Sequence, residues 1–102
     1  MYRGTTPTLN FTLPFDTSNI TALSVAFAQD EVVVLEKTYH DCVMSGKEVS
    51  VALTEEDTLL LDQDKREVEI QLRVGCGTSR LASKIIKTSV DRILKDGCLN
   101  EF

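Results

Sequence analysis

The sequence predicts an all-β fold, a small antiparallel β-sandwich that is immunoglobulin-like, with about seven strands and one short helical turn. Apolar and polar residues alternate with period two in several short segments, as in strands with one buried face. Turn residues separate these segments at intervals of roughly 8–12 residues. The single helical signal precedes a long, clean strand, as in immunoglobulin-like folds, although the chain has no tryptophan and lacks the paired cysteines of true immunoglobulin domains.

Length and charge limit the number of domains and the kinds of partner that the sequence is compatible with. The 102 residues predict one β-sandwich domain over 1–102, since domains commonly hold ~100–150 residues. The net charge is −5 and the basic residues are scattered, so neither nucleic acid nor an anionic membrane surface is expected as a partner. No apolar stretch approaches the ~20 residues that span a bilayer, and the N-terminal residues lack the apolar run of a secretion signal.

The first strands are read from alternation and prolines. Residues 8–13 form a predicted strand bracketed by Pro7 and Pro14. Because proline cannot donate to a ladder, we expect the strand to end at these residues, and they are compatible with a position at a sheet edge. After a turn, residues 23–28 and 32–35 predict a hairpin. The run over 32–35 is almost continuously apolar, which is typical of a strand covered on both faces or central in its sheet.

The middle of the chain predicts a second hairpin and the helical turn. Residues 41–44 and 48–53 flank Ser45-Gly46, and Gly supplies the positive φ that a tight turn needs. Thr54 can cap free amides, and the three acids that follow it favour the start of a helical turn. Residues 67–74 form the clearest strand, and residues 75–78 close the next hairpin.

The last segment, residues 80–94, is less regular. Adjacent Ile85 and Ile86 predict a bulge or apolar groups on both faces, and we expect a strand through Val90, with a short helix after it left open. Its part from Lys84 to Leu94 is richer in apolar residues than one buried face requires, and exposed apolar strips often mark association sites. It therefore predicts an interface formed by Lys84, Ile86, Val90, Ile93 and Leu94. The alternative is a bulged strand with a C-terminal turn packed on the core.

No catalytic site is predicted. His40 and Cys42 would share one strand face, but side chains at i and i+2 lie ~7 Å apart, too far for a nucleophile and its base. The acids Glu55, Glu56 and Asp57 are explained by stabilisation of a helix start. We therefore expect that the chain is not an enzyme.

No cofactor or metal site is predicted either. Counted from Asp62, the positions that need Gly and Glu in a calcium loop hold Glu67 and Arg73. Three cysteines, Cys42, Cys76 and Cys98, match no disulfide framework and no metal spacing, so we expect free thiols without an assigned role.

Several segments resemble a family of small phage and prophage proteins of Gram-positive, largely gut-dwelling bacteria. The similarity spans nearly the whole chain and is carried by Arg3–Pro14, Val34–Lys37, Leu53–Leu59, Glu69–Val74 and Arg92–Gly97. These motifs are strand patterns and contain no active-site signature.

The resemblance implies a non-enzymatic structural or assembly protein of a phage tail, baseplate or head. Such a protein would occupy the host cytoplasm during assembly and, in that role, the virion. Its partners would be other phage structural proteins or further copies of itself. Two alternatives stay open: a ligand- or carbohydrate-binding β-sandwich module, for which a chain with no Trp offers few aromatic platforms, and a small phage regulator that binds a host protein.

Overall fold

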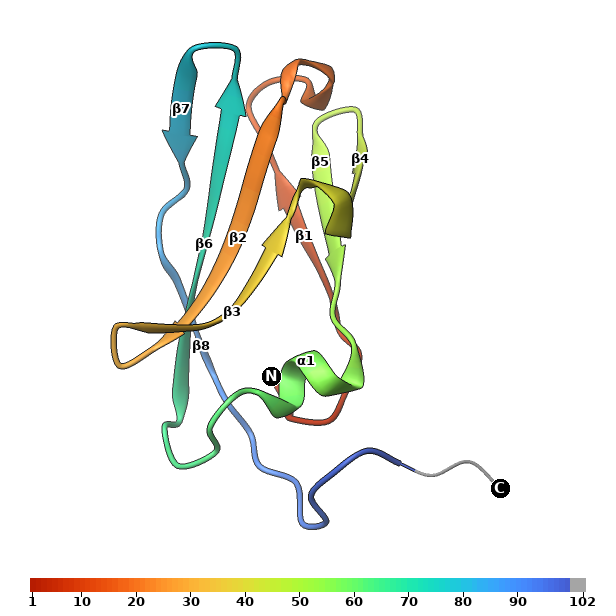
Figure 1. Cartoon of the computed structure of the whole chain (residues 1–102), viewed down its shortest axis with the longest axis vertical. Coiled ribbons are helices and arrows are strands. Elements are labelled where there is room, and N and C mark those ends of the chain that lie inside the picture. The colour runs from red at the N-terminus through yellow and green to blue at the C-terminus, as the bar shows by residue number, and fades with distance from the viewer. Residues whose placement is uncertain (100–102) are drawn as a thin grey trace.

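The computed structural model describes residues 1–99 as two antiparallel sheets packed face to face (Figure 1). The three-stranded sheet has the order β1-β5-β4, with bounds Thr8–Thr12, Glu48–Ala52 and Cys42–Ser45. The five-stranded sheet has the order β3-β2-β6-β7, with bounds Val32–Thr38, Ala22–Gln29, Glu67–Cys76 and Ser79–Ala82, and β8, Ile86–Ser89, also pairs with β6. Short helical segments are η1 (Thr17–Asn19), η2 (Tyr39–Asp41) and α1 (Glu55–Leu59).

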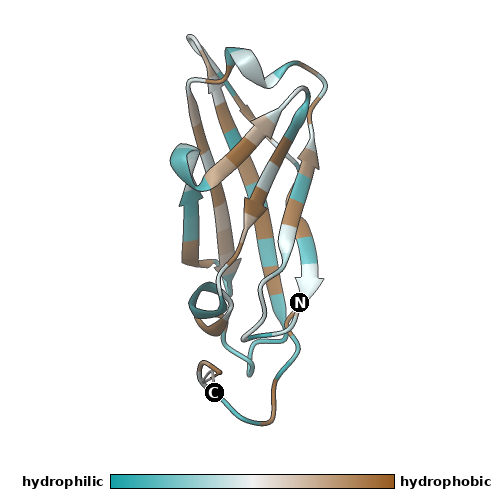
Figure 2. Ribbon diagram, turned by 90° about the vertical axis from the view of Figure 1, so that its right-hand side faces the viewer, coloured by the Kyte–Doolittle hydropathy of each residue, from teal (hydrophilic) through white to brown (hydrophobic). Residues whose placement is uncertain are grey.

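The alternation in the sequence gives each sheet one apolar face, visible as brown and teal bands along the strands in Figure 2. The inward faces meet in one core, and Val25, Phe27, Val49, Val51 and Val68 are fully buried in it. The predicted hairpins β2–β3 and β4–β5 form. Thr54 caps α1 by accepting a bond from the Asp57 N–H at 3.1 Å, and this confirms the helical turn.

The pairing order is that of an immunoglobulin domain. With β1 as strand B, the sheets read B-E-D and C′-C-F-G, as in the variable type. Strands β7 and β8 pair with successive parts of β6 and together take the place of strand G. No residue within 1–99 pairs with the outer edge of β1, where strand A of such a domain lies. The predicted fold class, an immunoglobulin-like β-sandwich, is confirmed.

Two details differ from the expectation. The run over 32–35 is neither central nor covered on both faces, because β3 is an edge strand and Val32 and Val33 are exposed. The last strand is interrupted at residues 83–85, where the Leu72 N–H donates to the Ser83 hydroxyl instead of a backbone carbonyl. The irregularity expected near Ile85 therefore divides the strand into β7 and β8, and no helix follows Val90 within the described residues.

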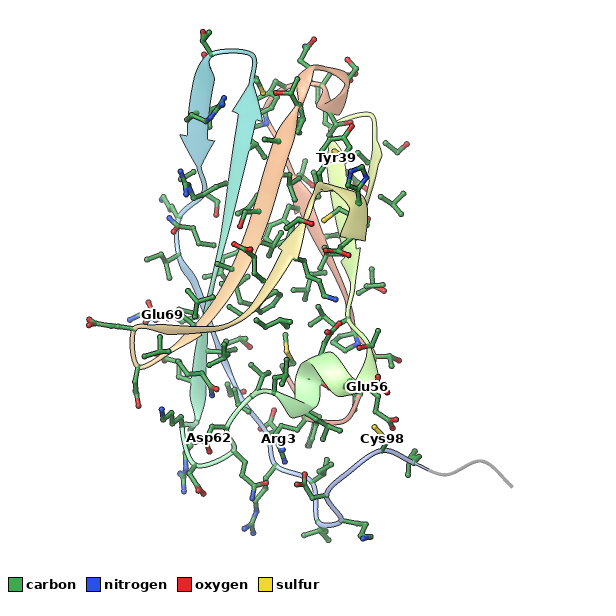
Figure 3. The ribbon with its side chains drawn as sticks, viewed as in Figure 1. Arg3, Tyr39, Glu56, Asp62, Glu69 and Cys98 are labelled. Carbon is green, nitrogen blue, oxygen red and sulfur yellow. The ribbon has the colours of Figure 1, made fainter. Side chains whose placement is uncertain are left out.

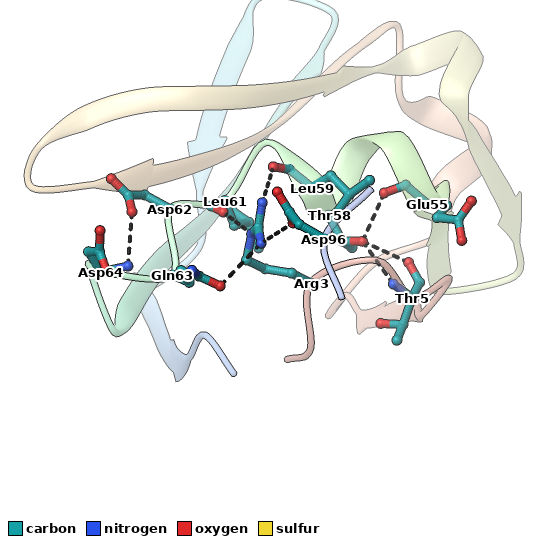
Figure 4. A network of polar contacts seen from close by, with 10 residues as sticks. All are labelled: Arg3, Thr5, Glu55, Thr58, Leu59, Leu61, Asp62, Gln63, Asp64 and Asp96. Carbon is teal, nitrogen blue, oxygen red and sulfur yellow. Dashed lines mark hydrogen bonds and ion pairs between the residues drawn. The ribbon is translucent and has the colours of Figure 1, made fainter. Parts of the chain in front are cut away.

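Buried polar side chains close the lower end of the sandwich (Figure 4). The Arg3 guanidinium donates to the carbonyls of Leu61 and Leu59 at 2.6 and 3.1 Å, and to Asp96 at 2.7 Å. Leu59 ends α1 and Leu61 follows it, so neither carbonyl has a helical partner and the guanidinium satisfies both. The bonds join the N-terminal residues to α1 and to the C-terminal segment.

The side chain of Gln29 likewise forms hydrogen bonds to backbone groups of the next turn. Its amide group donates to the carbonyls of Asp62 and Lys65 at 3.0 and 2.8 Å, and its oxygen accepts the Asp62 N–H at 2.8 Å. The side chain is almost wholly buried. It therefore holds the turn between α1 and β6 against the end of β2.

Candidate interaction groove

Strand β1 pairs on one side only. Leu13 N–H donates to the Lys47 carbonyl at 2.7 Å, and Leu53 N–H donates to the Pro7 carbonyl at 2.9 Å. In an antiparallel pair, alternate residues form the hydrogen bonds, so the odd-numbered residues of β1 bond to β5. The N–H and C=O groups of Thr8, Asn10 and Thr12 consequently point away from β5, along an edge that no strand of residues 1–99 covers.

Two hollows lie beside this edge, between β1 and the strands β6, β7 and β8. The lower one has a volume of about 550 Å³ and the upper one about 290 Å³. In Figure 1, β6, β7 and β8 lie to one side of β1. We call the two hollows together the β1 groove. It is lined on the β1 side by Met1, Tyr2, Thr5, Pro7, Leu9, Asn10, Phe11, Thr12, Leu13, Pro14 and Phe15, and on the other side by Ile70, Leu72, Val74, Leu81, Ala82, Ser83, Ile86 and Thr88.

The apolar side chains in the β1 groove are incompletely covered. Val49 and Val51 on the neighbouring strand β5 are 0% exposed, whereas Leu9 and Phe11 on β1 face the same interior and are only half-buried. On the opposite wall, Leu81 and Ile86 are each 46% exposed. Covering these groups would remove apolar surface from water, which is favourable.

The β1 groove also has few charges. No Asp, Glu, Lys, Arg or His side chain lines it, and the ammonium of Met1 is paired with Asp91 at 3.2 Å. The run Gly4–Phe15 contains no charged residue although the chain carries −5. Natural edge strands are commonly protected by charged side chains, especially lysine, or by proline. Here only the flanking Pro7 and Pro14 provide such protection, and they leave the strand between them open.

The five residues of the predicted interface do not form one surface. Ile86 lines the β1 groove. Val90 is buried in the core and its N–H donates to the Arg66 carbonyl at 2.6 Å. Lys84 and Leu94 are exposed, and Ile93 is half-buried. Of this set, the structure places only Ile86 in the β1 groove.

His40, Cys42 and the Asp41 between them make contacts that do not favour a nucleophilic cysteine. Asp41 accepts the Thr38 N–H at 2.9 Å in a capping arrangement around η2. The His40 ring packs edge-on against Tyr39, with centroids 5.4 Å apart. Partial burial raises the pKa of the Cys42 thiol, and the Asp41 carboxylate raises it further. A nucleophilic cysteine needs the opposite shift.

The remaining cysteines and acids lie apart from the β1 groove. The three thiols are free, and Cys98 lies beside Glu56 at the start of α1, with 3.8 Å between Sγ and Oε1 (Figure 3). Glu55, Glu56 and Asp57 occupy the first turn of α1. Over residues 1–99, no three His, Cys, Asp or Glu side chains cluster as metal ligands would, and no helix there has the length and apolar character to cross a membrane.

The alternation over residues 8–13 places Leu9, Phe11 and Leu13 on one face of the predicted strand, but it does not indicate that this face remains partly open. Two signals pointed towards it: the prolines that indicated an edge strand, and the absence of charge from Gly4 to Phe15. The opposite wall could not be predicted, because it depends on how β6 to β8 lie relative to β1.

Comparison with known proteins identifies no family for this chain. No family model and no curated protein matches the chain. Among solved structures, it is similar to the immunoglobulin-like domain of mouse leukocyte-associated immunoglobulin-like receptor 1, crystallised as a strand-swapped dimer, with 15% identity, a TM-score of 0.48, and coverage of 91% of this chain and 84% of that one. The immunoglobulin-like topology given above is read from the strand pairing of this chain itself.

Proposed function

We propose that this chain is a non-enzymatic structural or assembly protein of a phage or prophage particle, acting through protein–protein contacts. The observation that carries the proposal is the β1 groove, in which a free strand edge lies beside half-exposed apolar side chains. Such surfaces mark sites of protein association. The assignment to a phage particle rests on the resemblance of the strand segments to phage and prophage proteins.

The test uses particles from an induced lysogen that encodes the chain. Particles are purified on a density gradient, and the chain is quantified by mass spectrometry against known capsid and tail proteins. We expect it to co-purify at a fixed ratio to one of them. Its absence from particles, together with normal particle assembly after deletion of its gene, would refute the proposal.

A carbohydrate-binding role has weaker support. Sugar sites use exposed ring faces, and among the aromatic residues of 1–99 only Tyr2 and Tyr39 are exposed. The Tyr39 ring already contacts His40. A glycan array probed with the purified chain separates the two functions, because a specific glycan hit that survives substitution of the β1 groove would favour the ligand-binding alternative.

A further inference from the structure

We propose that the β1 groove binds one extended segment of a different protein chain, which pairs with β1 as an added strand in the place of strand A. The inference rests on the proposed function and specifies its partner. It follows from the backbone groups of β1, the side chains of the groove, and the space between the two sheets.

The backbone supplies the pairing. Thr8, Asn10 and Thr12 direct their N–H and C=O groups outward along the free edge, as derived above from the β5 register. An extended segment can bond to all three residues, which is the recognition mode of strand addition. Pro14 takes the next outward position and has no N–H, so it limits the pairing there. At ~3.3 Å per residue, the edge fits a segment of about five to seven residues.

The side chains define the chemistry of the segment. Successive residues of a strand point to opposite faces, so every second residue would enter the groove and meet Ile70, Ile86, Leu72 and Leu81. The groove offers no Asp, Glu, Lys, Arg or His side chain to pair with a charged residue of the segment, and an unpaired charge is costly to bury. The inward residues must therefore be apolar and uncharged, while the alternate residues lie beside Thr8, Asn10 and Thr12 and can be small and polar.

The space admits a single strand. Residues of β6 and β7 form the wall of the upper hollow opposite β1. A second copy that paired there through its own β1 would bring its own β6 and β7 wall into the same space. The N-terminal residues line the lower end of the groove but do not pair with β1, since Arg3 N–H donates to the Asp91 carbonyl at 3.1 Å and Asp91 N–H to the Met1 carbonyl at 2.7 Å. The geometry thus favours an arm or linker of another protein.

The probes are synthetic peptides of about eight residues in which Val alternates with Thr, added to the isotopically labelled full chain. A second peptide has the same composition with its Val residues grouped at one end, and a third replaces the inward Val residues by Lys. We expect the alternating peptide to bind with a Kd below about 1 mM and to shift the amide NMR signals of Thr8, Asn10 and Thr12. The grouped and Lys peptides should bind at least about tenfold more weakly.

Two matched pairs of variants locate the site. Ile85 and Ile86 are similarly exposed at 53% and 46%, but only Ile86 lines the groove, so Ile86→Ser should weaken peptide binding several-fold and Ile85→Ser should not. Asn10→Pro removes an outward N–H without removing a bond to β5, and we expect a loss of about tenfold or more. Asn10→Ala keeps that N–H and removes only the side chain, whose Oδ1 accepts from the Ser50 hydroxyl at 2.6 Å, so it should weaken binding much less than Asn10→Pro does.

Several results would overturn the inference. Equal binding of the alternating and grouped peptides would show that strand pairing is not involved, and unchanged binding by both Ile86→Ser and Asn10→Pro would place the site elsewhere. No amide shift at about 1 mM peptide would also refute it. A dimer of the chain that dissociates on Asn10→Pro would identify the occupant as a second copy. None of these results depends on whether the chain is present in purified particles, so the two proposals can fail separately.

Discussion

Replacement of Gln29 by Ala tests whether buried amide bonds hold the turn between α1 and β6. The side chain is 1% exposed and makes its three bonds to the backbone of Asp62 and Lys65. Each such bond contributes about 1 kcal/mol net. Because Asp62 and Lys65 are exposed, their freed groups can be rehydrated, which limits the penalty. We expect a loss of about 2–4 kcal/mol in the free energy of unfolding.

Such a loss is large for a domain whose total stability is about 5–15 kcal/mol. It should lower the Tm by roughly 8–32 °C, at about 4–8 °C per kcal/mol for a chain of this size. Urea unfolding followed by circular dichroism gives the free energy, and a thermal scan gives the Tm. Gln29→Met serves as the control because it keeps the volume and removes the polar atoms. If Gln29→Met matches the parent, or Gln29→Ala loses less than about 1 kcal/mol, the bonds do not stabilise the turn.

Three further predictions concern charge, backbone strain and the thiols. Burial works to raise the pKa of Asp57, but the bond from Lys37 at 2.7 Å and those from Thr54 outweigh it and leave that pKa below its ordinary value. The pair therefore adds stability above about pH 4 that is lost as the pH falls through the folded-state pKa, and the deficit of Asp57→Asn in urea unfolding should shrink over that range and not grow. Glu31 has φ 66° in the β2–β3 turn, a left-handed conformation that favours glycine, so Glu31→Gly should raise the free energy of unfolding by about 0.5–1 kcal/mol; a lower value would argue against strain. The raised pKa of Cys42 keeps its thiol protonated at pH 7, so its alkylation by iodoacetamide, measured by peptide mass spectrometry, should be slower than that of a free cysteine peptide and accelerate up to and beyond pH 9, whereas a plateau near pH 7 would contradict the shift.

Local patterns were sufficient to predict most of the strands. Alternation over 67–74 corresponds to β6, and the Ser45-Gly46 turn to the β4–β5 hairpin, because each depends on residues close in sequence. The prediction that residues 32–35 form a central or doubly covered strand was wrong, because hydrophobicity alone does not distinguish a central strand from an edge strand. Val32 and Val33 remain exposed because β3 has no neighbour on its outer side.

Long-range packing was beyond the reach of the sequence. Nothing in the residues around Arg3 indicates that its side chain is buried against the carbonyls of Leu59 and Leu61, because these partners lie 56 and 58 positions away. Likewise, the β1 groove arises between residues near 10 and residues near 86. The predicted interface segment contained one wall of it, at Ile86, but the facing wall belongs to the other sheet.

The contacts of Arg3 limit how much of this domain can fold while it is being synthesised on the ribosome. Its guanidinium bonds to Asp96, a residue 93 positions further along the chain, and β8 must reach β6 before the five-stranded sheet is complete. A nascent chain stalled before residue 86 would lack both closures and leave the outer edge of lower β6 unpaired. Native protection from protease should therefore arise only once residues 86–96 have left the exit tunnel, so this domain closes in one late step and not strand by strand during its own synthesis.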